Sequence, residues 1–455
     1  MKSALADLDL TATFDEYGSP VNLISPDAMN PNVEELRAIA RTREVDLQIF
    51  FARKANKCLA FVDAANRLGI GVDTASEIEV QQTLDRGTPA THCICTAAVK
   101  SKSLVGRCVD ESICLAIDNH DELERVRSVA AEMGKQAIVA LRLSGFKHAD
   151  QTLYSRFGFD CERDVAVIQA LDPSWAHVAG IHFHLDGYDP HQRVSAIDSS
   201  LDWIEKLRQA GHLPAFIDMG GGLPVCYLES ENQWTEFWKA HAESLLHHRG
   251  EITFQRHKLG RQVVDGRVVG SPASYPYFQS QTRSSWLATV LDAPIGGSTV
   301  AQRLNRERLQ LRCEPGRSLL DGCGMTIARV EYRKRDTQGR WLIGLSMNRT
   351  QCRTTSDDFL VDPILVPASA EQFESIEGYL VGAYCMESEL LSWRRFRFPC
   401  GVRVGDAVVF PNTAGYLMHF LESRSHQFPL ASNLVMPTDP ADCLRRDDID
   451  QAIVI

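Results

Sequence analysis

Residues 47–56, Leu47-Gln48-Ile49-Phe50-Phe51-Ala52-Arg53-Lys54-Ala55-Asn56, decide the fold because they place one lysine at the end of an apolar run. The run 47–52 is typical of a buried strand. A lysine at the end of such a strand loses hydration, so we expect the pKa of the Lys54 ammonium to fall. A free amine of this kind suits Schiff-base formation. A lone lysine is more often a surface residue, so the rest of the chain must decide.

Short apolar runs alternate with amphipathic segments from about residue 37 onwards. This alternation predicts parallel strands joined by right-handed crossovers. Eight such strands match a (β/α)8 TIM barrel, and an open doubly wound sheet is the alternative. The predicted strands are 47–52, 69–73, 92–96, 113–118, 137–143, 178–184, 215–219 and 309–314.

The length of 455 residues suggests two or three domains. We expect the barrel to occupy 37–317. Its last two strands lie too far apart for one ordinary crossover, so 228–300 is predicted to be an insertion. After residue 317 the sequence becomes rich in strand-forming runs. We therefore expect 318–455 to form a C-terminal β-sandwich or β-barrel domain, completed by residues 1–36.

The predicted insertion has structure of its own. Residues 234–248 are rich in Trp, Phe and His and predict a helix. Residues 252–254 and 263–269 predict the two strands of a hairpin, since Asp265-Gly266 suits a tight turn. The insertion could cover an active site, extend an interface, or do neither.

Composition excludes several classes of function. Hydrophobic residues make up 44% and charged residues 24% of the chain, which is ordinary for a soluble protein. A net charge of −11 argues against general binding to nucleic acid or anionic membranes. No apolar stretch approaches the ~20 residues of a membrane span, and the N-terminus has no signal-peptide pattern. Thirteen cysteines without a CxxC pair predict reduced thiols in the cytoplasm, with neither a zinc site nor disulfides.

Polar residues recur where the predicted strands end. In a TIM barrel the C-terminal strand ends form the active-site rim. Each of these residues alone has an ordinary structural explanation, such as a buried salt bridge or a glycine turn. Their coincidence on one rim is less easily explained that way. The residues are Lys54, Asp73, Arg142, His184, Gly220, Gly221, Gly222, Glu314, Gly316 and Arg317.

The triplet Gly220-Gly221-Gly222 lets backbone N–H groups approach an anion closely. It follows the seventh predicted strand, where barrels often bind phosphate. Arg317 could add a bidentate phosphate contact. A lysine, a phosphate cradle and an acid on one rim are the parts of a pyridoxal 5'-phosphate site.

These segments resemble the fold-type III pyridoxal-phosphate decarboxylases, which include diaminopimelate, ornithine and arginine decarboxylases. The resemblance covers nearly the whole chain except about 228–300. Several ordered motifs together make it specific, whereas no single motif would. The motifs are Ala52-Arg53-Lys54-Ala55-Asn56, Asp73–Glu77, Ser155-Arg156-Phe157-Gly158, Gly180–His184, Asp218–Pro224, Glu314-Pro315-Gly316-Arg317, Val404–Phe410 and Gly415-Tyr416.

The resemblance implies roles for the rim residues. Lys54 would hold the cofactor as an internal aldimine and later return a proton. Glu314 would pair with the pyridine nitrogen and keep it protonated, which makes the ring a better electron sink. His184 would stack on the ring. Tyr416 and Arg317 would help to hold the phosphate, while Asp73, Arg142 and Gly316 complete the cofactor site.

The resemblance also implies a catalytic role for a cysteine in the C-terminal region. Gly382-Ala383-Tyr384-Cys385-Met386-Glu387-Ser388-Glu389 resembles the family segment Gly-Pro-x-Cys-Glu-Ser-x-Asp. There the cysteine comes from the partner subunit and protonates the carbanion. The resemblance therefore implies that Cys385 is the proton donor and that the protein is a homodimer with shared active sites. A structural cysteine is the alternative.

The sequence departs from the family pattern at substrate-facing positions. Met386 stands where an acid meets the substrate's distal ammonium, so a cationic side chain held in the usual way is doubtful. Glu387 or Glu389 could replace that acid if the loop shifts. Arg353, or Arg349, could meet a distal carboxylate. The segment Leu185-Asp186 lacks the serine that touches phosphate in the family, so the phosphate contacts could be redistributed.

We predict a pyridoxal-phosphate-dependent decarboxylase that acts on an amino acid or an amino-acid derivative. A racemase or epimerase that uses the same cofactor is one alternative. Alanine racemases place an arginine at the ring nitrogen, and Glu314 therefore favours decarboxylation. A non-catalytic regulatory homologue is the other alternative, and the presence of Lys54, Glu314 and Cys385 argues against it.

Overall fold

The computed structural model describes residues 5, 8–356, 358–371, 373–437 and 443–451. Eight parallel strands form a closed barrel, because β6 pairs with both β5 and β10. This closure confirms the TIM barrel and rules out the open sheet. The strands are β2 (Leu47–Ala52), β3 (Gly71–Thr74), β4 (Cys93–Cys95), β5 (Cys114–Ile117), β6 (Ala137–Ser144), β10 (Ala176–His182), β11 (Phe216–Asp218) and β16 (Gln310–Cys313).

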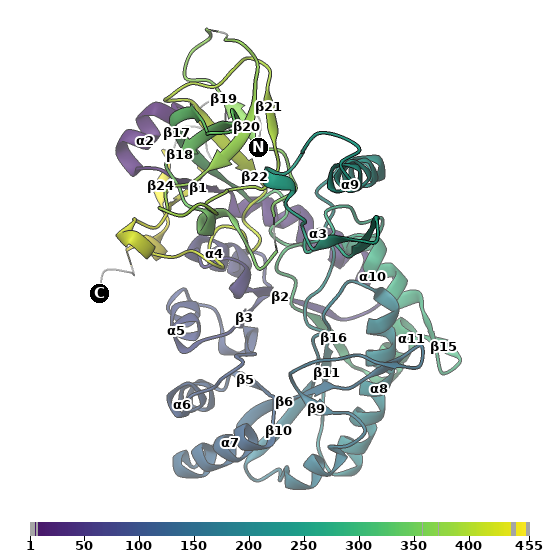
Figure 1. The fold of residues 1–455 in the computed structure, drawn as a ribbon. Coiled ribbons are helices and arrows are strands. Elements are labelled where there is room, and N and C mark those ends of the chain that lie inside the picture. Colours follow the sequence, from purple (N-terminus) through teal and green to yellow (C-terminus); the bar gives the residue numbers. More distant parts are fainter. Residues whose placement is uncertain (1–4, 6–7, 357, 372, 438–442, 452–455) are drawn as a thin grey trace.

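Helices surround the barrel and bury apolar faces against it (Figure 1). Several begin at a side-chain cap, as where Asn119 accepts from the N–H of Glu122 at the start of α7. The helices are α3 (Met29–Arg41), α4 (Leu59–Arg67), α5 (Glu77–Asp85), α6 (Lys102–Glu111), α7 (His120–Met133), α8 (Pro190–Gln209), α10 (Arg283–Asp292) and α11 (Val300–Glu307).

A second domain consists mostly of sheet and adjoins one end of the barrel (Figure 1). Its long strand β17 pairs with β1, β18 and β22. Thus β1, near the N-terminus, lies inside this sheet, between β17 and β23. The strands are β1 (Val21–Ile24), β17 (Gly324–Arg335), β18 (Trp341–Leu345), β19 (Ile364–Val366), β20 (Ile376–Val381), β21 (Phe396–Phe398), β22 (Ala407–Pro411), β23 (Ser432–Val435) and β24 (Arg445–Arg446).

The predicted insertion divides between the two domains. Helix α9 (Glu231–Leu245) and the buried tyrosines Tyr275 and Tyr277 join the apolar core of the sheet domain. Helix α10 instead buries Trp286 in the barrel core. The hairpin consists of β12 (Arg261–Val264) and β13 (Arg267–Gly270) around Asp265-Gly266. Assigning residues 252–254 to that hairpin was wrong, because Thr253 forms an isolated bridge with Arg394.

All thirteen cysteines are free thiols in this structure. In the described ranges we find no helix that combines the length and the hydropathy needed to cross a membrane.

Candidate active site

Lys54 lies in the short 3-10 turn that directly follows β2. Its Nζ donates to Oδ2 of Asp73 at 3.1 Å, and Oγ1 of Thr96 donates to Oδ1 of the same carboxylate at 2.5 Å. Burial lowers the pKa of Lys54, but the carboxylates of Asp73 and Glu314 outweigh it, and the net pKa lies above its usual value. The expectation of a lowered pKa was therefore wrong. It considered lost hydration alone and left out the two anions.

The floor of the site holds two carboxyl groups and one imidazole, all buried. His182 Nε2 lies 3.2 Å from Oε1 of Glu314. Burial lowers the pKa of His182 well below its usual value, so a neutral imidazole shares a hydrogen bond with this carboxyl group. Oε2 of Glu314 is buried without a partner among the described residues. It is thus free to accept a hydrogen bond from a bound molecule.

Asp218 lies next to this pair and ends strand β11. Burial first, and then the charge of Glu314, raise the pKa of Asp218 well above its usual value. Ligand atoms of His182, Asp218 and Glu314 all lie within 4.8 Å of one another, a spacing that a metal ion could use. Metal ligation requires ionised carboxylates, and burial also raises the pKa of Glu314. The cluster therefore suits a hydrogen-bonding organic group better than a metal.

Arg142 and His184 come from neighbouring strands, since Arg142 is in register with His182, two residues before His184. Arg142 in β6 stacks on Phe157, with its Cζ 4.2 Å from the ring centre, and its Nη1 lies 3.7 Å from Asp118. His184 lies two residues beyond the end of β10, not within the strand as predicted. Its Nδ1 accepts a hydrogen bond from the N–H of Gly221 at 3.1 Å. That bond fixes the ring plane beside the glycine run.

The glycine run Gly220–Gly222 requires the absence of side chains. Gly220 and Gly222 have φ values of +64° and +85°, in the left-handed region. A Cβ on Gly220 would lie 2.7 Å from Nδ1 of His184, and one on Gly221 would lie 2.9 Å from the carbonyl oxygen of Glu314. The run is therefore held tightly between β10 and β16, with its backbone close to the rim.

Arg317 lies at the same rim among aromatic rings. Its Cζ lies 4.3 Å from the ring centre of Tyr275 and 5.2 Å from that of Tyr416. Its Nη1 also donates to the carbonyl oxygen of Gly415 at 3.4 Å. Gly316 is pressed against Tyr416, since a Cβ there would lie 2.7 Å from the tyrosine hydroxyl. No acidic side chain pairs with Arg317 among the residues the structure describes, so its charge is available to an anion.

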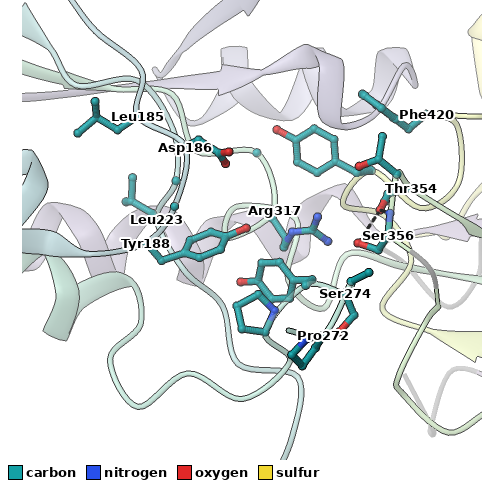
Figure 2. Close-up of a pocket in the computed structure, with 18 of the residues that line it drawn as sticks. Leu185, Asp186, Tyr188, Leu223, Pro272, Ser274, Arg317, Thr354, Ser356 and Phe420 are labelled. Atoms are coloured by element: carbon teal, nitrogen blue, oxygen red, sulfur yellow. Dashed lines mark hydrogen bonds between the residues drawn. The ribbon is translucent and has the colours of Figure 1, made fainter. Parts of the chain in front are cut away.

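A cavity of about 550 Å³ lies at this rim. Of the predicted site residues, those that line it in the described part of the chain are His184, Gly222, Gly316, Arg317 and Tyr416, whereas Lys54, Asp73, Arg142 and Glu314 are not part of its lining. Figure 2 shows Arg317 near its centre, with Tyr188 and Asp186 on one side and Thr354 and Ser356 on the other. The barrel loops supply one wall and the sheet domain supplies the opposite wall. The insertion closes a third side with residues 272–276. The cavity is large enough for a small-molecule ligand.

The insertion's part of the wall is rigidly anchored. The hydroxyl of Tyr275 donates to the carbonyl oxygen of Val225 and accepts from its N–H, each at 3.0 Å. The ring also meets Tyr188 edge-on at 5.2 Å. Three uses were considered for the insertion: covering an active site, extending an interface, or neither. Residues 272–276 correspond to the first, because they form part of the cavity wall.

None of the predicted substrate residues of the sheet domain is among the described residues that line the cavity of the same chain. Nη2 of Arg353 donates to the carbonyl oxygens of Leu390 and Leu391, so its guanidinium is engaged inside the domain. The residues after it, Thr354–Ser356, line the cavity instead. Arg349 donates through Nη1 to the carbonyl oxygen of Ser388.

The cysteine segment forms an exposed part of the sheet domain. Cys385, Met386 and Glu387 are exposed, whereas Glu389 is buried and accepts from the N–H of Arg349 at 2.7 Å. Among the described residues, those lining the cavity include none from this segment. The segment thus does not reach the cavity of its own chain.

Sequence reasoning missed several residues of the site. His182 and Asp218 were part of recognised motifs but were given no role. Tyr188, Tyr275 and Ser274 line the cavity, and no spacing pattern marked them. His182 and Asp218 could have been found, because each ends a buried barrel strand and must therefore lie at the rim.

Comparison with known proteins identifies the chain's relatives. Residues 32–263 match the family described as pyridoxal-dependent decarboxylase, pyridoxal binding domain. The chain is 31% identical to the uncharacterized protein y4yA of Sinorhizobium fredii, over 96% of this chain and 93% of that protein. It is 24% identical to a diaminopimelate decarboxylase of Halalkalibacterium halodurans, over 47% of this chain and 52% of that enzyme. The chain thus spans about half the length of that enzyme.

A solved structure extends the likeness over the whole fold. Diaminopimelate decarboxylase from Helicobacter pylori, complexed with L-lysine, superposes with a TM-score of 0.71 and covers 96% of this chain and 95% of its own. The sequence identity is 17%, so this likeness concerns the fold alone.

Proposed function

This chain belongs to the family of pyridoxal-dependent decarboxylases, and from that premise we propose how its own residues carry out the reaction. Its cofactor is pyridoxal 5'-phosphate, and it is an amino-acid decarboxylase. Within that class, we assign cofactor attachment to Lys54, the ring-nitrogen contact to Glu314 and proton donation to Cys385 of the partner subunit. The substrate is a further part of the proposal.

The residues present fit the cofactor. The observation that carries the assignment is the buried, partnerless Oε2 of Glu314 on the same rim as Lys54. A carboxylate that lacks a donor on one side suits a protonated ring nitrogen. In the glycine run, the N–H groups of Gly220 and Gly221 donate to Asp218 and His184, so the backbone N–H of Gly222 would be the one offered to the phosphate. When bound, the cofactor supplies an electron-accepting ring that stabilises negative charge at the substrate's α-carbon after CO2 leaves.

Lys54 and Asp73 are placed to transfer a proton between them at the rim. Lys54 is an ammonium at neutral pH, because its two acidic neighbours raise its pKa, and it must lose a proton before it can attach the cofactor. The nearest acceptor is Oδ2 of Asp73, 3.1 Å away. Burial raises the pKa of Asp73, which makes it a better base than an exposed aspartate. The same pair can later return the proton.

His182 holds Glu314 at the floor of the cofactor site, and His184 forms part of its wall. The neutral His182 would donate to Oε1 of Glu314 and would leave Oε2 available to the ring nitrogen. His184 is held by the N–H of Gly221 and would lie against one face of the ring. Arg142, whose pKa burial lowers, adds positive charge near Glu314 and opposes the rise that burial causes in the pKa of that carboxyl group.

Cys385 would act across a homodimer. It is exposed, and its segment lines no part of the cavity within its own chain. A head-to-tail dimer would bring this segment of one protomer to the cavity of the other. The thiol could then deliver a proton to the α-carbon from the side opposite Lys54.

The cavity supports a substrate whose side chain is polar and not cationic. Apart from Arg317, which would hold the phosphate, its walls offer the hydroxyls of Ser274, Thr354 and Ser356, with Asp186 as the acid on the barrel side. Met386 cannot neutralise an ammonium. We therefore propose an uncommon amino acid or an amino-acid conjugate with an oxygen-rich side chain. A cationic substrate would need Asp186 or Glu387 as its partner.

The proposal is tested by CO2 release across L-, D- and meso-amino acids and their acidic conjugates, with cofactor added. We expect turnover of at least one polar or acidic member, and an absorbance band of attached cofactor that Lys54→Ala abolishes. Lys102→Ala, at an exposed lysine on α6, is the matched control and should keep the band. Survival of the band in Lys54→Ala would contradict the assignment. Deuterium entering the α-carbon without CO2 release would point to a racemase instead.

A further inference from the structure

Arg193 is a fully buried arginine in the first part of α8. Its Nη2 donates to the carbonyl oxygens of Leu185 at 2.9 Å and Gly187 at 2.7 Å. Its Nε and Nη1 are buried without partners, and no ion pair of Arg193 exists among the residues described here. Burial lowers the pKa of its guanidinium to about 10, so the side chain still carries its charge at neutral pH.

A buried charge without a counter-ion is unfavourable unless an anion compensates it. The acids closest in sequence, Asp186 and Asp189, are both exposed, and neither forms a salt bridge with Arg193. They act on it only from a distance. The ring of Trp286, 5.7 Å from the Cζ of Arg193, faces the guanidinium but carries no formal charge. An anion bound nearby would supply the counter-charge, and the location of Arg193 indicates which one.

Arg193 lies directly behind the glycine run. Its Nη2 is 3.5 Å from the carbonyl oxygen of Gly221, and a Cβ on Gly222 would collide with it. The turn that it holds, residues 185–187, lines the cavity beside Gly222 (Figure 2). This turn carries the exposed acid Asp186 at the cavity wall. A positive charge behind the turn and the glycine run would offset the negative charge of Asp186.

We propose that Arg193 is a positioning residue for the cofactor's phosphate. Its buried charge attracts the phosphate dianion from behind the glycine run, and its hydrogen bonds hold the 185–187 turn in place. The inference rests on the proposed function, because it requires the phosphate to lie at Gly220–Gly222. A purely structural tie between the two loops is the competing explanation.

Removing the phosphate from the ligand separates these explanations. The apoenzyme is titrated with pyridoxal 5'-phosphate and with pyridoxal, which has the same ring and aldehyde but no phosphate. Affinities are measured for the wild type, Arg193→Met, Arg193→Lys and the control Arg208→Met. Arg208 lies on the same helix and forms a surface pair with Glu307.

We expect Arg193→Met to weaken pyridoxal 5'-phosphate binding by about tenfold or more, as for loss of one charge-assisted contact, while pyridoxal binding stays within about twofold. Arg193→Lys should keep most of the preference for the phosphate, because it keeps the charge. Arg208→Met should match the wild type. If Arg193→Met does not fold, Arg193→Lys alone remains decisive, since loss of the preference there would overturn a role for charge.

Two failures are distinguishable. A wild-type protein that binds both ligands equally, or neither, contradicts the proposed function. A wild-type preference for the phosphate that Arg193→Met retains, or equal weakening of both ligands in that variant, overturns only the role of Arg193.

Discussion

The inner rim of the active site and the outer wall of its cavity are held in place in different ways. Rim residues such as Asp73 and Asp218 lie within hydrogen-bonded strands, where Asp73 is in register with Ala52 of the next strand. The wall segments 272–276 and 354–356 are loops, positioned by packing between domains. Rigid strand ends suit chemistry that tolerates little displacement, whereas loops can change without disturbing it. We therefore expect the rim to determine the reaction and the wall to select the substrate.

The largest effect is expected at the floor of the rim. Glu314→Gln keeps the shape of the side chain but removes the anion that holds the ring nitrogen protonated. We expect kcat to fall by a factor on the order of 10² to 10⁴, the range for loss of a key electrostatic or acid–base group. The absorbance spectrum of the bound cofactor should change as well. Steady-state kinetics and spectra of the purified variant measure both.

The matched control is Glu132→Gln, at an acid that forms a surface pair with Lys102 on the barrel exterior. It should leave kcat unchanged. A kcat of Glu314→Gln within tenfold of the wild type would contradict the view that the rim determines the reaction and the wall selects the substrate.

The next largest effect tests whether the rim is complete within one chain. Cys385→Ala should lower kcat by about 10²-fold through loss of a proton donor, whereas Cys400→Ala, at another exposed thiol of the sheet domain, should not. Mixing Lys54→Ala with Cys385→Ala should restore roughly a quarter of the wild-type activity, because half of the random dimers contain one intact shared site. No recovery on mixing would place Cys385 at the site of its own chain or outside any site.

The barrel was predictable because its signals are local. Each of the eight predicted strands overlaps an observed strand, and the run 47–52 has the same bounds as β2. Parallel strands bring their C-terminal ends together, so the sequence alone is enough to place Lys54, Asp73 and Glu314 on one rim. The shares of the insertion in the two domains were not predictable. They depend on which core Trp286 and Tyr275 enter.

The electrostatics of the rim were also hard to predict, because they too depend on how segments distant in the sequence pack together. The pKa of Lys54 depends on the distances to Asp73 and Glu314, which lie on other strands. The lone charge of Arg193 is visible only once its neighbours are known. Sequence indicates which groups meet at the rim, but their net effect on one another depends on how the strands place them in space.

A smaller effect is expected at the outer wall. Ser274→Phe places a ring into the cavity from the insertion side. We expect KM for the substrate identified in the CO2 screen to rise about tenfold, as for a lost or crowded side-chain contact, with cofactor affinity unchanged. Ser280→Phe, at an exposed position further along the insertion, should change neither. A fall in cofactor affinity in Ser274→Phe would mean that the wall and the rim are not separable.

The smallest effect should come from the hairpin that precedes the wall segment. Its valines Val263 and Val264 are exposed, and β12 pairs only with β13 in the structure as described. Deleting Val263, Val264, Arg267 and Val268 removes two rungs, keeps the Asp265-Gly266 turn and preserves the alternation of the pairing. Activity should stay within about twofold, and stability should change by no more than about 0.5 kcal/mol, as at exposed positions generally. Kinetics, thermal unfolding and sedimentation measure these quantities. A loss of activity together with dissociation to monomers would mean that the hairpin serves the shared site through the dimer, and the wall would then extend beyond residues 272–276.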